Sequence, residues 1–458
     1  MLRYPAMEGR LFLVDGTALA YRAHFAFIGN PLTTSRGQPT SAAYGYISDI
    51  LRLLREERPD FMAVAFDRPE PTFRKKQYPD YKATREKAPD DMVAQLPAIK
   101  EVTEALGIPV LERAGYEADD LIGTAARLAE ERGLEVLIVS GDKDMMQLVT
   151  ARVRIYDLSR RAGPGVIDAD GVRRRFGVAL GRVVDVMGLM GDTSDNVPGV
   201  PLIGPKKATA LVQKWGSLEE VLAHAAEGKP SKTRRNLIEF ADQARLSKEL
   251  VTIRTDVPVE ICFDRLHPGA RDRDRLVKLF GELEFAQLLP QVVGEGAEEA
   301  STRGYRIVRT AAEIDALAAD LKRARFFVFD TETTGLDPFG ADLVGIAFCW
   351  KKGEASYVPC EDAAAVLERL RPVLEDPELR KGGQNLKYDA QVLRTHGVEV
   401  RNLAFDTMIA SYLLDPGRGV HNLDLLALRH LNIRKTPIGD LIGKGRDQIT
   451  MAEVPVER

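Results

Sequence analysis

The chain has 458 residues, of which 45% are apolar and 29% charged, and its formal net charge is −4. This composition predicts a globular protein of about three domains and excludes a largely disordered chain. It contains neither a run of about 18 apolar residues, as a membrane span requires, nor the apolar core of a signal peptide. The cysteines Cys262, Cys349 and Cys360 lack metal-type spacing and fit a reducing cytoplasm rather than a disulfide framework.

Three short apolar runs in the first half of the chain end in aspartates. RLFLVDG reaches Asp15, FMAVAFD reaches Asp67, and EVLIVSGDKD reaches Asp142 and Asp144. Amphipathic helical patterns separate them, as in SAAYGYISDILRLLREE and PDDMVAQLPAIKEVTEALG. This alternation predicts a parallel sheet wrapped by helices, with its functional crevice outside the carboxyl ends of the strands. All three runs deliver an acid to that edge.

The patterns change further along the chain. Residues from about 168 to 290 are more polar and predict helices, with one strand expected within SKELVTIRTDVPV (247–259). QVVGEGAEEASTRG (291–304) has no periodicity and predicts a linker. RFFVFDTETTG and DLVGIAFCW then predict paired strands, and SYVPC a third, in a second α/β segment.

Nine acids lie at strand ends and adjoining helix starts of the first segment, and the topology predicts that they converge. They are Asp15, Asp67, Glu117, Asp119, Asp120, Asp142, Asp144, Asp192 and Asp195. Converging acids repel unless cations separate them, and oxygen-only ligands favour Mg²⁺ or Mn²⁺. Two such ions about 4 Å apart can act on a phosphodiester. The alternatives are helix-start acids in YEADDL, strand-end caps at Asp15 and Asp67, and a turn at GDTSDN.

Two basic features fit a nucleic-acid substrate. TFRKKQYPDYKATREK (72–87) interleaves basic residues, which neutralise phosphates, with aromatic residues, which stack on unpaired bases. GVPLIGPKKATALVQKW (199–215) places a glycine-containing turn before a helix that starts near Lys206, where N–H groups and lysines can bind an anion. The alternatives are a solvated surface segment and a plain helix–turn–helix connection.

Six motifs in register resemble the 5′ nuclease, or flap endonuclease, domain of the bacterial DNA polymerase I family over residues 9–290. They are LVDGTALAYRAHFAF, AVAFD, TFRKKQYPDYKATR, GYEADDLIGTAA, SGDKDMMQLV and GDTSDNVPGVPLIGPKKA. The resemblance implies a PIN/flap-endonuclease-like core with an arch at 9–170, a helix–hairpin–helix subdomain at 171–290 and a linker at 291–304. It implies a cytoplasmic, nucleoid-associated bacterial monomer that cleaves flapped, nicked or gapped DNA in replication and repair.

The resemblance also implies a role for each matched position. Two Mg²⁺ or Mn²⁺ ions are expected, one served by Asp15, Asp67, Glu117, Asp119 and Asp120, the other by Asp142, Asp144, Asp192 and Asp195. Tyr21, Arg22, Arg74, Lys82 and Arg85 are expected to engage the scissile phosphate or form the arch, with Lys75 and Lys76 in DNA binding. Gly199, Gly204, Lys206 and Lys207 match the hairpin that grips duplex phosphates, where K⁺ is often bound. The family has Gly where this chain has Leu202, which weakens the expectation of close backbone approach there.

Residues 305–458 contain a second acid group. Asp330 and Glu332 are two apart on a predicted strand and share a face. Asn385 and Asp389 are four apart at a predicted helix start, on one helical face. FDTETTGL, GQNLKYD and AFDTMIASYLL resemble the 3′–5′ exonuclease domain of the same family. This implies an RNase H-like α/β fold with Asp330, Glu332 and Asp389 as metal ligands. Leu336, Asn385 and Tyr388 are expected to hold a DNA 3′ end.

The second resemblance is incomplete. The family's Tyr-x-x-x-Asp element is not found after Asp389 in this sequence, so we expect a truncated domain, an incomplete site and weak or no 3′–5′ exonuclease activity. Two other functions are weighed for the whole chain: a non-catalytic DNA-binding scaffold and a metal-dependent phosphatase. A phosphatase-type nucleophile at Asp330 is disfavoured because Asp-x-Glu stands where Asp-x-Asp is usual. For Asp389, a helix cap is the alternative.

Overall fold

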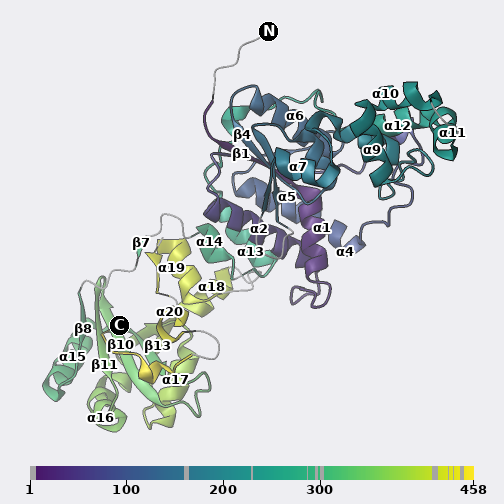
Figure 1. Ribbon diagram of the computed structural model, residues 1–458. Helices are drawn as coiled ribbons and strands as arrows, with labels where there is room; N and C mark the ends of the chain where they lie inside the picture. The colour runs from purple at the N-terminus through teal and green to yellow at the C-terminus, as the bar shows by residue number, and fades with distance from the viewer. Residues whose placement is uncertain are drawn as a thin grey trace. The chain divides into compact units, whose positions relative to one another are not determined.

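The computed structural model describes residues 7–158, 165–227, 231–285, 287–293, 298–299, 304–414, 421–431, 433–436, 438–443 and 448–457. The chain divides into two compact units, Met1–Leu276 and Val277–Arg458. Each unit contains its own six-stranded sheet (Figure 1). In the described ranges, no helix combines the length and the apolar character needed to cross a membrane.

The sheet of the first unit has the strand order β3-β2-β1-β4-β5-β6. Its strands are β1 (Arg10–Asp15), β2 (Phe61–Ala65), β3 (Val110–Leu111), β4 (Glu135–Val139), β5 (Val153–Asp157) and β6 (Gly165–Ile167). All neighbours are parallel except β5 and β6, which are antiparallel. Apart from the first residue of β1 and of β4, β1, β2 and β4 are buried throughout, as expected of central strands that helices cover on both faces. The three predicted strands are confirmed.

Helices surround this sheet. They are α1 (Gly16–Ala26), α2 (Ser41–Glu56), α3 (Phe73–Gln77), α4 (Asp90–Val93), α5 (Leu96–Ala105), α6 (Ala118–Glu130) and α7 (Ala169–Phe176). The predicted helix over SAAYGYISDILRLLREE is α2, while PDDMVAQLPAIKEVTEALG forms two helices, α4 and α5. Pro97 stands in the first turn of α5, where its missing N–H costs no hydrogen bond.

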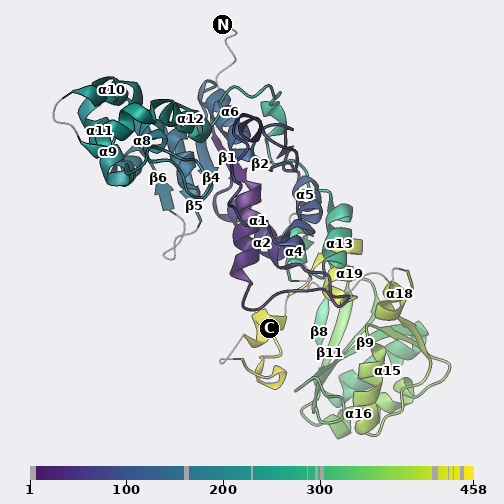
Figure 2. The same cartoon turned by 90° about the vertical axis from the view of Figure 1, so that its right-hand side faces the viewer.

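A group of helices follows α7 and gathers at one side of the same unit (Figure 2). They are α8 (Val183–Met190), α9 (Pro205–Trp215), α10 (Leu218–Ala223), α11 (Lys232–Glu239) and α12 (Ala241–Val251). The strand expected within 247–259 is wrong, because its first residues belong to α12 and the rest carries no strand. The β-branched residues there favour a strand locally, but the segment's backbone hydrogen bonds go to side chains of neighbouring elements.

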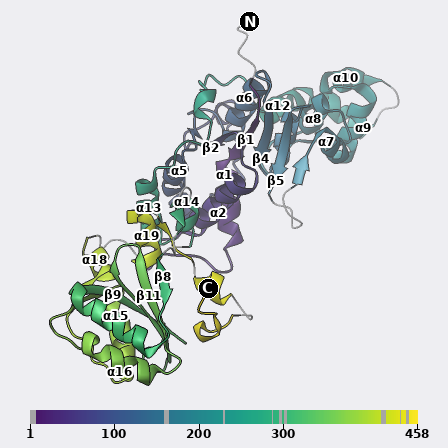
Figure 3. The same cartoon turned by 90° about the vertical axis from the view of Figure 1, so that its left-hand side faces the viewer.

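The second unit has the strand order β13-β12-β9-β10-β11-β8. Its strands are β8 (Tyr305–Ile307), β9 (Phe326–Thr333), β10 (Leu343–Lys351), β11 (Glu354–Pro359), β12 (Arg380–Gly383) and β13 (Leu403–Asp406). The predicted pair is β9 and β10, which run antiparallel, and β11 is the predicted third strand. Helices α15 (Ala311–Ala324) and α16 (Ala363–Leu374) pack against each other beside this sheet (Figure 3).

The remaining elements of the second unit are short. They are α14 (Leu289–Val293), β7 (Glu298–Glu299), α17 (Leu386–Thr395), α18 (Thr407–Leu414), α19 (Leu423–Leu431), β14 (Ile433–Arg434) and α20 (Ile438–Ile442), while α13 (Arg273–Glu282) spans the division between the units. Strand β7 pairs with β14, so part of the predicted linker 291–304 has regular structure. Residues 294–297 and 300–303 of that linker lie outside the described residues.

Candidate active site

The acids that follow β1, β2 and β4 meet at one edge of the first sheet. Asp15 ends β1 and caps α1, because its Oδ1 accepts a hydrogen bond from Ala18 N at 2.9 Å. Its Oδ2 accepts from Ser140 Oγ, after β4, at 3.2 Å. Asp67, after β2, accepts from Ala118 N, at the start of α6, at 2.9 Å. The predicted convergence of these strand ends is confirmed.

The acids at the start of α6 divide into two groups. Glu117 and Asp120 form a capping box, in which each side chain accepts a hydrogen bond from the other's backbone N–H. These two residues therefore cap the helix, which agrees with the alternative that they are helix-start acids. Asp119 instead takes no part in the capping box. Burial, followed by the charges of Asp15, Asp142, Glu117 and Asp67, raises its pKa well above the usual value.

Burial and mutual repulsion oppose ionisation at this edge. Burial, followed by the charges of Asp67 and Asp142, raises the pKa of Asp15 to about 7. Burial, followed by the charges of Asp142 and Asp192, raises the pKa of Asp144 to about 8 despite Lys143. Cations bound at this edge would favour the ionised carboxylates and relieve their repulsion.

The donor chemistry fits hard divalent cations, since these acids present only oxygen ligands. Asp144 Oδ1 is buried without a hydrogen-bond partner in the described part of the chain, so a ligand atom is unused. Among the described residues, however, no three His, Cys, Asp or Glu side chains are arranged to hold one metal ion as they stand. Ion binding there would therefore require some carboxylates to reorient.

Asp192 and Asp195 are joined to this edge through lysines. Lys143 Nζ lies 2.9 Å from Asp192 Oδ2. Burial raises the pKa of Asp192, but the hydrogen bonds from Lys143 and Ser194 outweigh burial, and the net shift is downward. Asp195 Oδ2 is 3.6 Å from Lys82 Nζ. Sequence reasoning assigned no role to Lys143, although its position between Asp142 and Asp144 was a signal.

Tyr81 and Lys82 link the predicted arch to both sets of acids. The Tyr81 hydroxyl lies 3.2 Å from Glu117 Oε2 and 3.1 Å from Asp195 Oδ2. Lys82 Nζ donates to Glu117 Oε1 at 3.0 Å, and Lys82 has a left-handed backbone with φ of 55°. The structure thus places Lys82 beside Glu117 and Asp195, and adds Tyr81, which sequence reasoning left out of the site.

Arg74 is not placed to contact DNA, and this prediction is wrong. Its side chain is 2% exposed and forms two 2.8 Å hydrogen bonds with Asp120. Its remaining donors reach Leu250 O at 2.8 Å and Thr252 O at 2.9 Å. The same pairing occupies both oxygens of Asp120, which is fully buried. The structure therefore does not present Asp120 as a free metal ligand.

The other predicted phosphate-contacting residues lie around the acids or on the surface. Arg22 and Asp142 line one cavity of about 230 Å³, and Arg22 also pairs with Asp49 and donates to Leu158 O. The ring of Tyr21 packs on Phe25 with centroids 4.9 Å apart. Of the predicted DNA-contacting residues in the basic segment, Lys76 and Arg85 are exposed, whereas Lys75 donates to Tyr81 O at 3.0 Å.

The predicted hairpin lies between α8 and α9. Gly204 is the N-cap of α9, and Lys206 and Lys207 lie in the first turn of that helix. Gly199 has φ of 60°, and a Cβ there would lie 2.4 Å from Gly191 N, so this position requires glycine. Leu202 has φ of 69° and is 54% exposed. Its carbonyl accepts from Lys207 Nζ at 3.0 Å. The turn therefore keeps a glycine-like backbone despite the leucine.

The second unit brings three predicted acids together. Asp389, on α17, accepts from Thr331 N at 2.8 Å and from Thr331 Oγ1 at 2.7 Å. This ties it to β9 between Asp330 and Glu332. Burial, then the Asp330 charge, raises the pKa of Glu332 to about 7. Burial also raises the pKa of Asp389 to about 6. Lys435 acts electrostatically on Asp330 and Glu332.

The residues expected to hold a 3′ end lie near this trio in different ways. Leu336 is 95% exposed. The Tyr388 hydroxyl hydrogen-bonds Thr333 Oγ1 at 2.6 Å and donates to Gly335 O at 2.7 Å, so it holds the turn before Leu336. Asn385 precedes α17 as its N-cap, with φ of 57°. Because it lies outside the helix, the predicted shared helical face with Asp389 is wrong.

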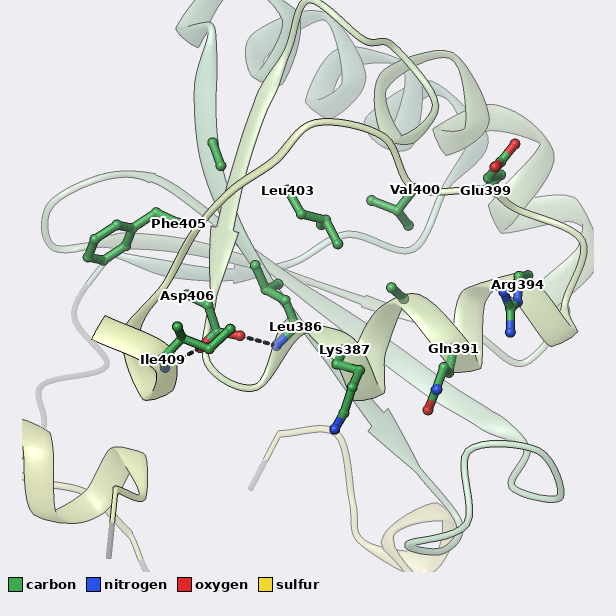
Figure 4. A pocket seen from close by; sticks show the side chains of 12 residues that line it. Leu386, Lys387, Gln391, Arg394, Glu399, Val400, Leu403, Phe405, Asp406 and Ile409 are labelled. Carbon is green, nitrogen blue, oxygen red and sulfur yellow. Dashed lines mark hydrogen bonds between the residues drawn. The ribbon is translucent and has the colours of Figure 1, made fainter. Parts of the chain in front are cut away.

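The second unit also has an open cavity of about 640 Å³ between α17, β13 and α18 (Figure 4). Asp406 organises its wall by accepting from Leu386 N at 2.8 Å and Ile409 N at 3.2 Å. Lys387, Gln391 and Arg394 project from α17 along it. None of the three acids lines this cavity, so it is separate from the trio.

Three family models match the chain. They are the 5′–3′ exonuclease N-terminal resolvase-like domain over residues 10–177, the 5′–3′ exonuclease C-terminal SAM fold over 178–274, and the 3′–5′ exonuclease over 305–457. DNA polymerase I of Pseudomonas aeruginosa is 39% identical over 486 residues, covering 98% of this chain and 52% of the relative. DNA polymerase I of Chloroflexus aurantiacus is 39% identical over 496 residues, with the same coverage of 98% and 52%.

The chain therefore spans about half the length of the curated relatives it matches. Among solved structures, a complex of the bacteriophage T5 flap endonuclease with DNA and metal ions has a TM-score of 0.47 and 21% identity, covering 60% of this chain and 98% of that one. The two sheets lie within the regions that the 5′–3′ exonuclease and 3′–5′ exonuclease models match. The chain belongs to the bacterial DNA polymerase I family, and contains its 5′–3′ exonuclease/flap endonuclease region, a class of metal-dependent DNA nucleases, and its 3′–5′ exonuclease domain.

Proposed function

We propose that the first unit is a structure-specific 5′ nuclease that hydrolyses DNA phosphodiesters near a 5′ flap. The observation that carries this proposal is the acid cluster at the ends of β1, β2 and β4. Asp15 is buried, Asp144 is partly buried, and Asp67 and Asp142 are exposed. Burial and mutual repulsion raise the pKa of Asp15 to about 7 and that of Asp144 to about 8. A DNA-binding surface without metal ions would gain nothing from such acids, because they repel phosphates.

Within this proposal, Asp15, Asp67, Asp119, Asp142 and Asp144 form the main ligand set for two Mg²⁺ or Mn²⁺ ions. Bound divalent ions lower the pKa of water and stabilise charge on the scissile phosphate. Glu117 is hydrogen-bonded by Lys82 and Tyr81. Asp192 is paired with Lys143. Both acids would become available to an ion when these partners move away. Asp120 and Arg74 support the start of α6 from within the protein.

The protein's cations would handle the DNA. Lys82, Arg85 and Arg22 lie beside the acids or on the arch and would contact the strand that carries the scissile phosphate. Lys206 and Lys207 at the start of α9, with Gly199 and Gly204, would bind duplex phosphates, since a helix N-terminus offers free N–H groups. We further propose that a K⁺ ion binds at this hairpin. The proposed domains are the nuclease core at 9–170, the helix–hairpin–helix subdomain at 171–290, the linker at 291–304 and the 3′–5′ exonuclease-like domain at 305–458. We also propose that the protein is a monomer of the bacterial cytoplasm.

A metal-titrated flap-cleavage assay tests the proposal. We expect Asp67→Asn and Asp142→Asn to remove most cleavage of a 5′-flap DNA while duplex binding persists. The matched control is Glu56→Gln, an isosteric change of an exposed acid at the end of α2, which should cut at the parental rate. Parental cleavage by both active-site variants would refute the assignment. Absence of product across Mg²⁺ and Mn²⁺ titrations would favour the DNA-binding scaffold, and phosphate release from small esters the phosphatase.

For the second unit we propose that Asp330, Glu332 and Asp389 bind metal ions at a DNA 3′ end. The support is their shared location on β9 and α17 and the upward pKa shift of all three. Leu336, Tyr388 and Asn385 would hold the terminal nucleotides. We propose weak 3′–5′ exonuclease activity for the 458-residue polypeptide by itself, because its sequence has no Tyr-x-x-x-Asp element after Asp389.

A further inference from the structure

The short segment after α12 has an unusual set of hydrogen bonds. In each of five consecutive residues, Leu250 to Arg254, one backbone group bonds to a side chain. Arg74 donates hydrogen bonds to Leu250 O and Thr252 O at 2.8 and 2.9 Å. Gln147 Nε2 donates to Val251 O, and Gln147 Oε1 accepts from Ile253 N, both at 2.9 Å. Asp120 Oδ1 accepts from Arg254 N at 2.8 Å.

Each of these side chains also belongs to, or contacts, a segment that carries acids of the first sheet's edge. We call this edge, where Asp15, Asp67, Asp119, Asp142 and Asp144 lie, the acid edge. Arg74 pairs with Asp120 of the α6 capping box. Gln147 lies in the 3₁₀ helix η1 (Lys143–Leu148), and its Nε2 donates to Asp144 O at 3.0 Å. The amide of Gln147 therefore uses both donor hydrogens and its acceptor oxygen. It joins the backbone of an acid-bearing residue directly to the end of α12.

Asp144 depends on that backbone for its direction. Its Oδ1 is buried with no hydrogen-bond partner among the described residues. The contacts that fix Asp144 are those of its main chain, where its N–H donates to Asp142 Oδ1 at 2.8 Å and its carbonyl accepts from Gln147. Loss of the Gln147 amide would remove one of these two contacts, which add to the backbone hydrogen bonds of the 3₁₀ helix itself.

Helix α12 contacts the hairpin at Gly199 through two side chains, one of them near the start of the helix. Ser247 Oγ accepts from Gly199 N at 3.0 Å, and Gln243 Nε2 donates to Gly199 O at 2.6 Å. Helix α12 therefore leads from the proposed duplex-binding hairpin to the segment that Gln147 and Arg74 hold. A rigid element with fixed contacts at both ends can carry coupling between two binding sites.

We propose that Gln147 is a positioning residue, which aims Asp144 for metal binding by tying η1 to the end of α12. In consequence, duplex DNA on the hairpin strengthens metal binding at Asp144. This inference rests on the proposed metal-dependent nuclease function and adds to it a residue outside the acid set. Partners that orient a metal ligand typically change metal affinity 10- to 100-fold when they are removed.

The test compares Gln147→Met, which keeps the side-chain length but loses all three hydrogen bonds, with Arg127→Met. Arg127 Nε bonds Thr255 O at 2.8 Å, so it anchors the same stretch of chain without contacting an acid-bearing loop. Mn²⁺ binding is measured directly from the free-ion signal in electron paramagnetic resonance, with and without a blunt DNA duplex. Flap cleavage and thermal unfolding are measured in parallel.

We expect Gln147→Met to weaken Mn²⁺ binding about 10-fold and to abolish the gain in affinity that the duplex gives the parent. Arg127→Met should bind Mn²⁺ within twofold of the parent even if both variants melt at a lower temperature. Gln147→Asn, whose shorter amide cannot span the same three contacts, should behave as Gln147→Met does and replaces it if that variant does not fold.

Equal Mn²⁺ binding by the parent and the Gln147 variants would overturn the inference while leaving the proposed nuclease intact. So would an equal loss in Arg127→Met, which would show a general loosening of the segment. A parent that neither binds Mn²⁺ nor cleaves flap DNA would instead refute the proposed function itself, and the inference with it.

Discussion

Asp15 offers a direct test of how burial and charge repulsion at the acid edge affect the free energy of unfolding. It is 5% exposed, and its pKa rises from 3.8 to about 7 in the folded protein. Because the folded state binds this proton more tightly than the unfolded state, stability is greatest below pH 3.8 and falls as the pH rises to about 7. At ~1.4 kcal/mol per pKa unit, the full penalty is up to ~4 kcal/mol above pH 7.

Asp15→Asn removes this charge while keeping an oxygen that can accept from Ala18 N. At pH 5 the folded carboxyl is still protonated, and the penalty is only ~1.6 kcal/mol. We therefore expect Asp15→Asn to stabilise the metal-free protein at pH 8, and by ~2.5 kcal/mol more at pH 8 than at pH 5. Mg²⁺ should stabilise the parent more than the variant, since it neutralises the same charge.

The assay is urea unfolding in EDTA, followed by tryptophan fluorescence. The chain has two tryptophans, Trp215 in the first unit and Trp350 in the second. A Trp350→Phe background therefore lets Trp215 report the first unit alone. Asp168→Asn is the matched control, since Asp168 caps α7 as Asp15 caps α1 but has a lowered pKa.

The control should move in the opposite direction. A lowered pKa adds stability above the unfolded pKa, so Asp168→Asn should reduce stability at pH 8. The reasoning is refuted if Asp15→Asn destabilises the metal-free protein at pH 8, or if its effect is the same at pH 5 and pH 8.

Three further predictions concern other positions. Arg74→Met should lower the free energy of unfolding by about 3–5 kcal/mol, because it leaves Asp120 buried without a charged partner. In the same urea titration, Arg68→Met should have no measurable effect, because it breaks only the exposed pair with Glu70. Equal effects of the two variants would contradict the buried pairing. Leu202→Gly should raise the free energy of unfolding by about 1 kcal/mol, because it removes the backbone strain of a leucine with left-handed φ. Leu202→Asn should have an intermediate effect. A loss of stability in both variants would show that the contacts of the leucine side chain outweigh its backbone strain. On a labelled single-stranded 3′ end, the 458-residue polypeptide should show only weak degradation, and a robust rate that Asp330→Ala abolishes would contradict this.

Much of the architecture could be predicted because it is written in local patterns. The buried runs that end at Asp15, Asp67 and Asp142 form neighbouring strands, and topology then brings their acids together. Arg74 could not be assigned correctly, because it sits in a basic run that predicts a surface, while its partner Asp120 is 46 residues away. Gln147 gave only a weak signal: an uncharged polar residue within the apolar stretch MMQLV.

The acid edge also constrains which sequences can improve this fold. Ordinary stabilising substitutions are easy to find in natural proteins, and their recurrent cost is lost function. At Asp15, Asp119 and Asp144, neutral side chains would relieve the repulsion that raises the three pKa values. A library selected only for heat resistance in the presence of a chelator should therefore accumulate changes at these positions. The positions that are substituted most often in this library would identify the functional edge of the sheet without any measurement of nuclease activity.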